Sequence, residues 1–110
     1  MKKFLIPLLL LSGACHATGL SAADQAAAMA MAKDNGCFSC HAMNEKVVGP
    51  SFSAIAERYR GEAGAAASLV QAIQNGSKGK WGRIPMPPHS SIGQADLAKL
   101  ANWVLSVPKQ

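Results

Sequence analysis

The sequence predicts an all-α domain of about four helices. Three observations lead to this prediction. Helix start and stop signals flank an alanine-rich segment near the N-terminus, apolar residues recur at helical spacing near the C-terminus, and no segment is rich in strand-forming residues. With 110 residues, the chain is long enough for one domain with a limited core.

The first predicted helix spans residues 21–35. Its sequence begins Ser-Ala-Ala-Asp, which resembles a capping box, and Asn35 with Gly36 supplies a C-terminal stop signal. We expect Met29 and Met31 to be packing residues, because methionine commonly fills irregular gaps in a core.

Two shorter helices are predicted over residues 53–60 and 65–74, and the second ends at the Asn-Gly pair of residues 75–76. Each helix has apolar residues on one side, which we expect to face the core. They are Ile55, Ala56 and Tyr59 in the first helix, and Leu69, Val70 and Ile73 in the second.

The last predicted helix, residues 94–107, has the most regular pattern. Its apolar residues follow the spacing i, i+3, i+4, i+7 and i+8, which places them on one face. Ser91 is the expected N-cap, Pro108 is the expected terminator, and Trp103 is expected at the edge of the apolar face. The face itself consists of Leu97, Leu100, Ala101, Val104 and Leu105.

Residues 76–91 cannot form a regular helix, because they contain Gly79, Gly82 and three prolines. We therefore expect an ordered loop. A loop of this length in a small domain calls for a functional explanation.

Residues 1–17 are predicted to be a cleaved signal peptide, which leaves residues 18–110 as the mature domain. Two lysines precede an apolar run over residues 4–11, and small residues follow, as in an export signal. The run is too short to span a bilayer. Cleavage after Ala17 fits best, and cleavage near residues 22–23 is an alternative. A further alternative is a lipoprotein anchored at Cys15, because residues 11–15 resemble a lipobox with its leucine one place displaced.

The net charge of +5 does not indicate nucleic-acid binding. Lys2 and Lys3 contribute two of these charges and would leave with the signal peptide, and the other basic residues are scattered rather than joined to a binding motif. We expect either a solvated surface or a mildly cationic rim that steers an acidic partner. The candidates for this rim are Lys46, Lys78 and Lys80.

Residues 37–41 read Cys-Phe-Ser-Cys-His, and C-x-x-C-H is the attachment motif of c-type haem. In a helical turn, residues i, i+3 and i+4 share a face, so Cys37, Cys40 and His41 would point the same way. Two thiols can then form thioether bonds to a haem while the imidazole reaches the iron. The sequence therefore predicts one covalent haem c, attached through both cysteines and ligated by His41.

Other uses of two cysteines at this spacing are a thioredoxin-like redox pair, a structural disulfide and half of a zinc site. The redox pair needs a βαβ context, and the sequence shows no strand-rich run. Zinc would need two further ligands, whereas the mature chain offers only His89 beyond the motif.

Met86 is the candidate for the second axial ligand. It lies in the sequence Ile-Pro-Met-Pro-Pro, where the prolines favour extended backbone and limit the freedom of the loop before folding. Met43 is too close to His41 in sequence to reach the other face of the haem. His89 is the alternative ligand, and we expect it to replace Met86 at raised pH, since neutral imidazole is the better ligand form.

Six short motifs are spread over the mature chain, at residues 37–41, 48–50, 75–77, 81–82, 84–88 and 103–106. Together they resemble the small bacterial class I c-type cytochromes of the cytochrome c-551 type, the cytochrome c8 family. The resemblance covers essentially the whole mature chain.

The resemblance implies about four helices around one haem, with the first and last helices crossing. It also implies that the Pro50 carbonyl accepts a hydrogen bond from His41, and that Trp81 donates its indole N–H to a haem propionate. The chain departs from the family at two positions near the haem. His89 stands where relatives commonly have asparagine, and Ala72 replaces a basic residue.

With both axial positions filled, the iron has no open site for a substrate, which favours a periplasmic one-electron carrier over an enzyme. One alternative is a haem peroxidase or gas-binding cytochrome with a displaceable Met86. Another is a non-haem redox or metal module built on the two cysteines. A carrier is expected to be a monomer that binds donor and acceptor proteins transiently. Nitrite reductase, a cytochrome c peroxidase or a terminal oxidase would each be compatible with the resemblance.

Overall fold

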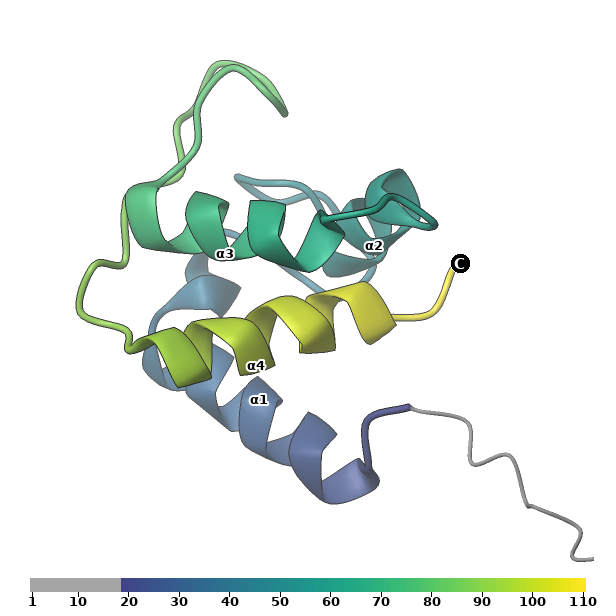
Figure 1. The fold of residues 1–110 in the computed structure, drawn as a ribbon. Coiled ribbons are helices and arrows are strands. Elements are labelled where there is room, and N and C mark those ends of the chain that lie inside the picture. Colours follow the sequence, from purple (N-terminus) through teal and green to yellow (C-terminus); the bar gives the residue numbers. More distant parts are fainter. Residues whose placement is uncertain (1–18) are drawn as a thin grey trace, which may run out of the picture.

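Four α-helices and one short 3₁₀ helix make up the regular structure of residues 19–110, the part of the chain that the computed structural model describes. The predicted signal peptide up to Ala17 and the alternative anchor Cys15 lie outside these residues. The helices α1 and α4 cross, and α3 runs alongside α4 (Figure 1). The all-α prediction is therefore confirmed. The elements are α1 (Ala22–Asp34), η1 (Cys37–Ser39), α2 (Phe52–Tyr59), α3 (Ala65–Asn75) and α4 (Gln94–Ser106).

The ends of α1 are those that its sequence predicts. The side chain of Ser21 accepts a hydrogen bond from the backbone N–H of Asp24 at 3.1 Å, which satisfies one of the unpaired donors of the first turn. After the helix, Gly36 has a φ of +74°, the left-handed conformation that favours glycine. Met29 and Met31 pack against the core, as predicted.

The shorter helices agree with the sequence prediction to within one residue. Ser51 caps α2 by accepting from the N–H of Ala54 at 3.1 Å, so the helix begins at Phe52 and this aromatic ring enters the core. Two glycines of positive φ flank α3, Gly64 at +77° and Gly76 at +78°. Glycine at these positions lets the chain turn sharply at both ends of the helix.

Two predictions for α4 are wrong. The N-cap is Gly93 rather than Ser91, because Ser91 lies within a turn and Gly93 is the extended residue that directly precedes the helix. Trp103 is not at the edge of the apolar face but only 3% exposed, and its ring packs against that of Phe52 at 5.0 Å between centroids. Because α4 packs against α1, α2 and α3, its buried face is wider than the spacing of its aliphatic residues indicates.

The core is built around α4, which contributes Leu97, the largest fully buried side chain of the described residues. The other helices supply small or aromatic residues that close around it, among them Ala28, Ala32, Phe52, Ala56 and Tyr59. None of the helices in residues 19–110 is long and apolar enough to cross a membrane.

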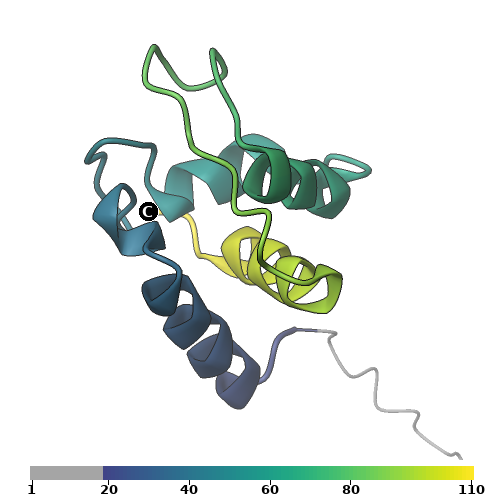
Figure 2. The ribbon, with the colours of Figure 1, turned by 90° about the vertical axis from the view of Figure 1, so that its left-hand side faces the viewer.

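The segment between α3 and α4 is irregular, as its prolines and glycines predict. Figure 2 shows it leaving the end of α3, projecting beyond the helices and returning to the start of α4. Its two arms meet near the base, where Ser77 and Met86 form an isolated antiparallel bridge. This bridge fixes the backbone of Met86 beside the C-terminal end of α3.

Replacing Leu97 by alanine tests the central position of α4. The side chain is fully buried, so Leu97→Ala leaves a cavity and is expected to lower the free energy of unfolding by about 2–5 kcal/mol. Chemical denaturation of the haem-loaded protein measures this change. Val47→Ala is the control, because Val47 is 55% exposed and its truncation should have little effect. Equal losses in the two variants would contradict the assignment of the core.

Candidate functional site

The cysteine-histidine motif forms a tight helical turn. The backbone N–H of Cys40 donates to the carbonyl of Cys37 at 3.2 Å, and the N–H of His41 donates to the same carbonyl at 2.9 Å. Both cysteines are half-buried and His41 is buried. All three side chains line one cavity, which is the outcome expected from their spacing in a helical turn.

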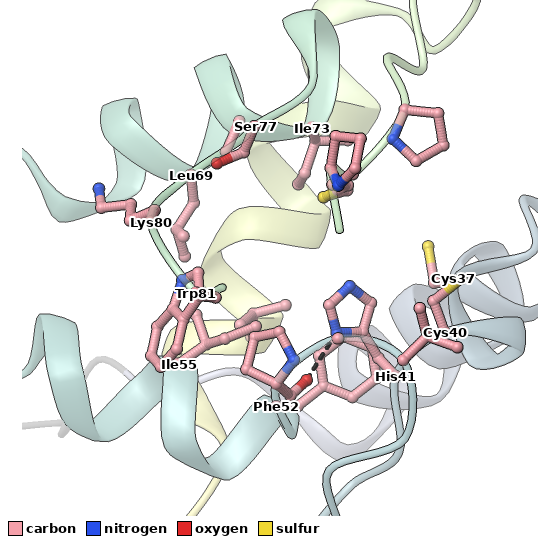
Figure 3. Close-up of a pocket in the computed structure, with 18 of the residues that line it drawn as sticks. Cys37, Cys40, His41, Phe52, Ile55, Leu69, Ile73, Ser77, Lys80 and Trp81 are labelled. Carbon is pink, nitrogen blue, oxygen red and sulfur yellow. Dashed lines mark hydrogen bonds between the residues drawn. The ribbon is translucent and has the colours of Figure 1, made fainter. Parts of the chain in front are cut away.

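This cavity has a volume of about 1040 Å³, including the part that opens to solvent. Figure 3 shows side chains from α2, α3 and the loops converging on it. Its helical lining is mostly apolar and includes Phe52, Ile55, Leu69, Ile73, Leu100 and Val104.

The imidazole of His41 is fixed by a hydrogen bond to the backbone. Its Nδ1 lies 2.6 Å from the carbonyl oxygen of Pro50. Because a carbonyl oxygen only accepts, Nδ1 must carry the proton and donate it, and the neutral ring then keeps a free lone pair on Nε2. The ring also stacks at a tilt on Phe52, with centroids 5.2 Å apart. A histidine held in this tautomer is ready to ligate a metal through Nε2.

Gly49 is a site residue to which the sequence analysis assigned no role. A Cβ atom at this position would lie 2.7 Å from Cε1 of His41 and 3.1 Å from Nδ1. The absence of a side chain therefore lets the backbone pass against the ring face. The Gly-Pro pair of residues 49–50 is the feature of the sequence that could have indicated this role, but the sequence analysis assigned a function only to the Pro50 carbonyl.

Met86 is half-buried, and backbone pairing holds it in place. Its N–H donates to the Ser77 carbonyl at 2.7 Å, and the Ser77 N–H donates back at 3.1 Å. The approach is so close that a Cβ on Gly76 would lie 2.6 Å from the carbonyl oxygen of Met86. Gly76 is thus a second residue whose role the sequence analysis did not assign.

The two candidate axial ligands enter the cavity from opposite sides. In Figure 3, Ile73 and Ser77 lie on one side of the cavity, and His41 and Phe52 lie on the other. Since Met86 pairs with Ser77 and lines the same cavity, its side chain approaches from the side that faces His41.

The remaining residues singled out in the sequence fall into two groups. Trp81 is half-buried and lines the cavity, with the guanidinium of Arg58 4.5 Å from its ring centroid, and Ala72 also lines it. His89, in contrast, is not among the lining residues, and its backbone N–H donates to the carbonyl of Ile73 at 2.9 Å. Ligation by His89 would therefore require the loop to rearrange.

The alternatives for the cysteine pair find little support in this geometry. Burial raises the pKa of the Cys37 thiol above its ordinary value, whereas reactive thiols have lowered pKa values. Within residues 19–110, no three histidine, cysteine or acidic side chains are grouped so that they could hold a metal ion.

Comparison with known proteins identifies the family. The sequence profile described as cytochrome c matches residues 25–108. The chain belongs to the cytochrome c family. It is 42% identical over 106 residues to cytochrome c-551 of Pseudomonas aeruginosa, an alignment that covers 96% of this chain and 98% of that protein. Together with the fold, this similarity confirms a class I c-type cytochrome of the c-551 type.

Solved structures show the same fold. The crystal structure of wild-type Nitrosomonas europaea cytochrome c552 superposes on this cytochrome with a TM-score of 0.70 at 42% identity, covering 73% of this chain and 99% of that one. The class 1 cytochrome MtoD of Sideroxydans lithotrophicus ES-1 superposes with a TM-score of 0.63 at 28% identity, covering 74% and 94% of the two chains.

Membership of this family means that the cytochrome carries one haem c, attached covalently through Cys37 and Cys40. The cavity fits such a group. Its lining is mostly apolar, and it brings together both cysteines, an imidazole whose Nε2 is free to ligate a metal, and Met86.

Replacing Gly49 by alanine tests the packing around His41. The new methyl group would force the imidazole or the backbone to shift, so Gly49→Ala should destabilise the haem-loaded protein by about 1–3 kcal/mol and alter its reduction potential. Thermal unfolding and a redox titration measure the two effects. Gly19→Ala is the control, because a Cβ there meets no atom within 4 Å. A Gly49→Ala protein indistinguishable from this control would contradict the close packing.

Proposed function

We propose that this cytochrome is a periplasmic carrier of single electrons, with the haem iron ligated by His41 and Met86. The observation that supports this most directly is the entry of these two side chains into one apolar cavity from opposite sides. The haem, when bound, supplies the change of one electron between ferric and ferrous iron.

The protein's own residues account for the properties of a carrier. The hydrogen bond from His41 Nδ1 to Pro50 fixes the ring and strengthens it as a ligand. The backbone pairing of Met86 with Ser77 holds the thioether on a loop that is anchored at its base. With both positions filled there is no open coordination site, and ligation by methionine raises the reduction potential.

Trp81 is proposed to donate its indole N–H to a haem propionate. It lines the cavity, and in Figure 3 it lies at the end away from Cys37 and Cys40. An indole N–H in a partly buried site usually finds an acceptor.

Export to the periplasm is supported by the sequence at the N-terminus. We propose that residues 1–17 are cleaved after Ala17 and that residues 18–110 form the mature protein. A diacylglycerol on Cys15, detected by mass spectrometry of the mature protein, would instead show a lipoprotein.

A peroxidase or gas-binding function is the second candidate, but the cavity favours it less. It requires a displaceable ligand and an acid-base group on that side of the iron. His89, the expected candidate for such a group, is not among the cavity-lining residues that the structure describes.

Transient docking of redox proteins is proposed at the mouth of the cavity. Lys78 and Lys80 line the cavity and are exposed, and Lys46 is exposed and pairs through its backbone with His41. Val48 and Ile84 add exposed apolar surface at the same cavity. An apolar centre with nearby cations suits brief contact with an acidic partner. Nitrite reductase, a cytochrome c peroxidase and a terminal oxidase are the candidate partners.

Carbon monoxide binding to the ferrous protein tests the proposed ligation. The unsubstituted protein should show the weak sulfur-to-iron absorption band in its ferric state and should bind carbon monoxide slowly or incompletely at neutral pH. Met86→Ala should lose the band, bind carbon monoxide rapidly and have a lower reduction potential. Met29→Ala, a core methionine, is the control and should retain the band. Rapid, complete binding by the unsubstituted protein would favour the gas-binding alternative.

Salt dependence tests the docking surface. The rate of electron transfer to an acidic partner protein should fall as ionic strength rises, because salt screens exposed charges. The dependence of this rate on ionic strength should weaken when Lys46, Lys78 and Lys80 are replaced together by glutamine. It should change little in Lys99→Gln. A rate that does not depend on ionic strength would contradict electrostatic steering by these three lysines.

A further inference from the structure

Two adjacent residues of α2, Arg58 and Tyr59, contact two adjacent residues of the loop, Lys80 and Trp81. The guanidinium of Arg58 lies 4.5 Å from the ring centroid of Trp81, and the ammonium of Lys80 lies 4.8 Å from the ring centroid of Tyr59. Nη1 of Arg58 also donates to the carbonyl oxygen of Lys80 at 2.9 Å. Cations placed over aromatic rings in this way are attracted by the ring face.

This contact lies at one end of the cavity. Figure 3 places Lys80 and Trp81 at the end opposite to Cys37 and Cys40. In haem c, the thioether bonds and the two propionates are on opposite edges of the macrocycle. A haem attached through these cysteines would therefore direct its carboxylates toward Lys80 and Trp81.

The cations that line the cavity belong to the loop, whereas Arg58 of α2 reaches the same end but is engaged with the Trp81 ring and the Lys80 carbonyl. The residues that α3 contributes to the lining include Leu69, Ala72 and Ile73, which are all apolar, whereas the lysines that line the cavity are Lys78 and Lys80. A propionate that leaves water needs a positive partner or hydrogen-bond donors to remain ionised.

We propose that Lys80 is the electrostatic partner of a haem propionate, held in place by Tyr59 and Arg58; this rests on the haem orientation in the proposed function. Lys80 is favoured over Lys78 because its position is fixed at two points, the ammonium on the Tyr59 ring and the carbonyl by Arg58. An ammonium group has three donors, so contact with the ring leaves others free for a carboxylate.

The expected consequence is a change in the reduction potential of the haem. A fixed positive charge near the haem disfavours the ferric state, which carries one more positive charge than the ferrous state. Lys80 should therefore raise the reduction potential. Its removal should lower the potential without disturbing the axial ligands, because neither His41 nor Met86 is among the groups that hold it.

The experiment is a redox titration of the haem-loaded protein at fixed pH and ionic strength, with the sulfur-to-iron band recorded in each sample. Lys80→Met should lower the potential several-fold more than Lys99→Met, which removes the same charge from an exposed position on α4 that does not line the cavity. Lys80→Arg should restore most of the difference. Redox-induced infrared difference spectra should show the propionate carboxylate bands shifted in Lys80→Met and not in Lys99→Met.

Two results would overturn the role of Lys80. One is a potential in Lys80→Met equal to that in Lys99→Met, with unchanged carboxylate bands. The other is a larger fall in Lys78→Met than in Lys80→Met. Either result with the sulfur-to-iron band intact leaves the proposed ligation standing, whereas absence of this band from the unsubstituted protein would instead contradict the ligation by Met86.

Discussion

The hydrogen bond between Nδ1 of His41 and the carbonyl of Pro50 is the interaction on which the site depends. It determines which ring nitrogen is protonated and therefore which one is available to a metal. Several other features serve to keep it in place. The helical turn of residues 37–41 brings the ring into the cavity, Gly49 leaves room for it, and Phe52 lies against it. A short segment between η1 and α2 thus defines one side of the iron site.

The opposite side is organised differently, by the loop between α3 and α4. Met86 is half-buried, and the loop that carries it is held by backbone pairing with Ser77, a glycine that allows close approach, and contacts from α2. The helices provide a rigid frame because α4 packs against the three others. The cavity is consequently bounded by the buried His41 on one side and by the tethered Met86 on the other.

The sequence allowed the helices, the thioether motif and the two candidate ligands to be predicted, because each depends on local spacing or on a short motif. It did not reveal the burial of Trp103, which arises where three helices meet around α4. Nor did it assign roles to Gly49 and Gly76, whose importance comes from the close approach of His41 and Met86, which depends on how the loops fold and not on a helical or strand spacing. Contacts such as that of Lys80 with Tyr59 are long-range and have no pattern that a single sequence displays.

The pairing of Ser77 with Met86 joins the two ends of the loop segment that lies between them. Arg58 holds this segment at a second point, by donating a hydrogen bond to the carbonyl of Lys80. Only residues 81–85 lie between Lys80 and the methionine, and lengthening such a tip adds little to the entropic cost of closing it. The length and chemistry of this tip can therefore vary without moving Met86, the proposed sulfur ligand.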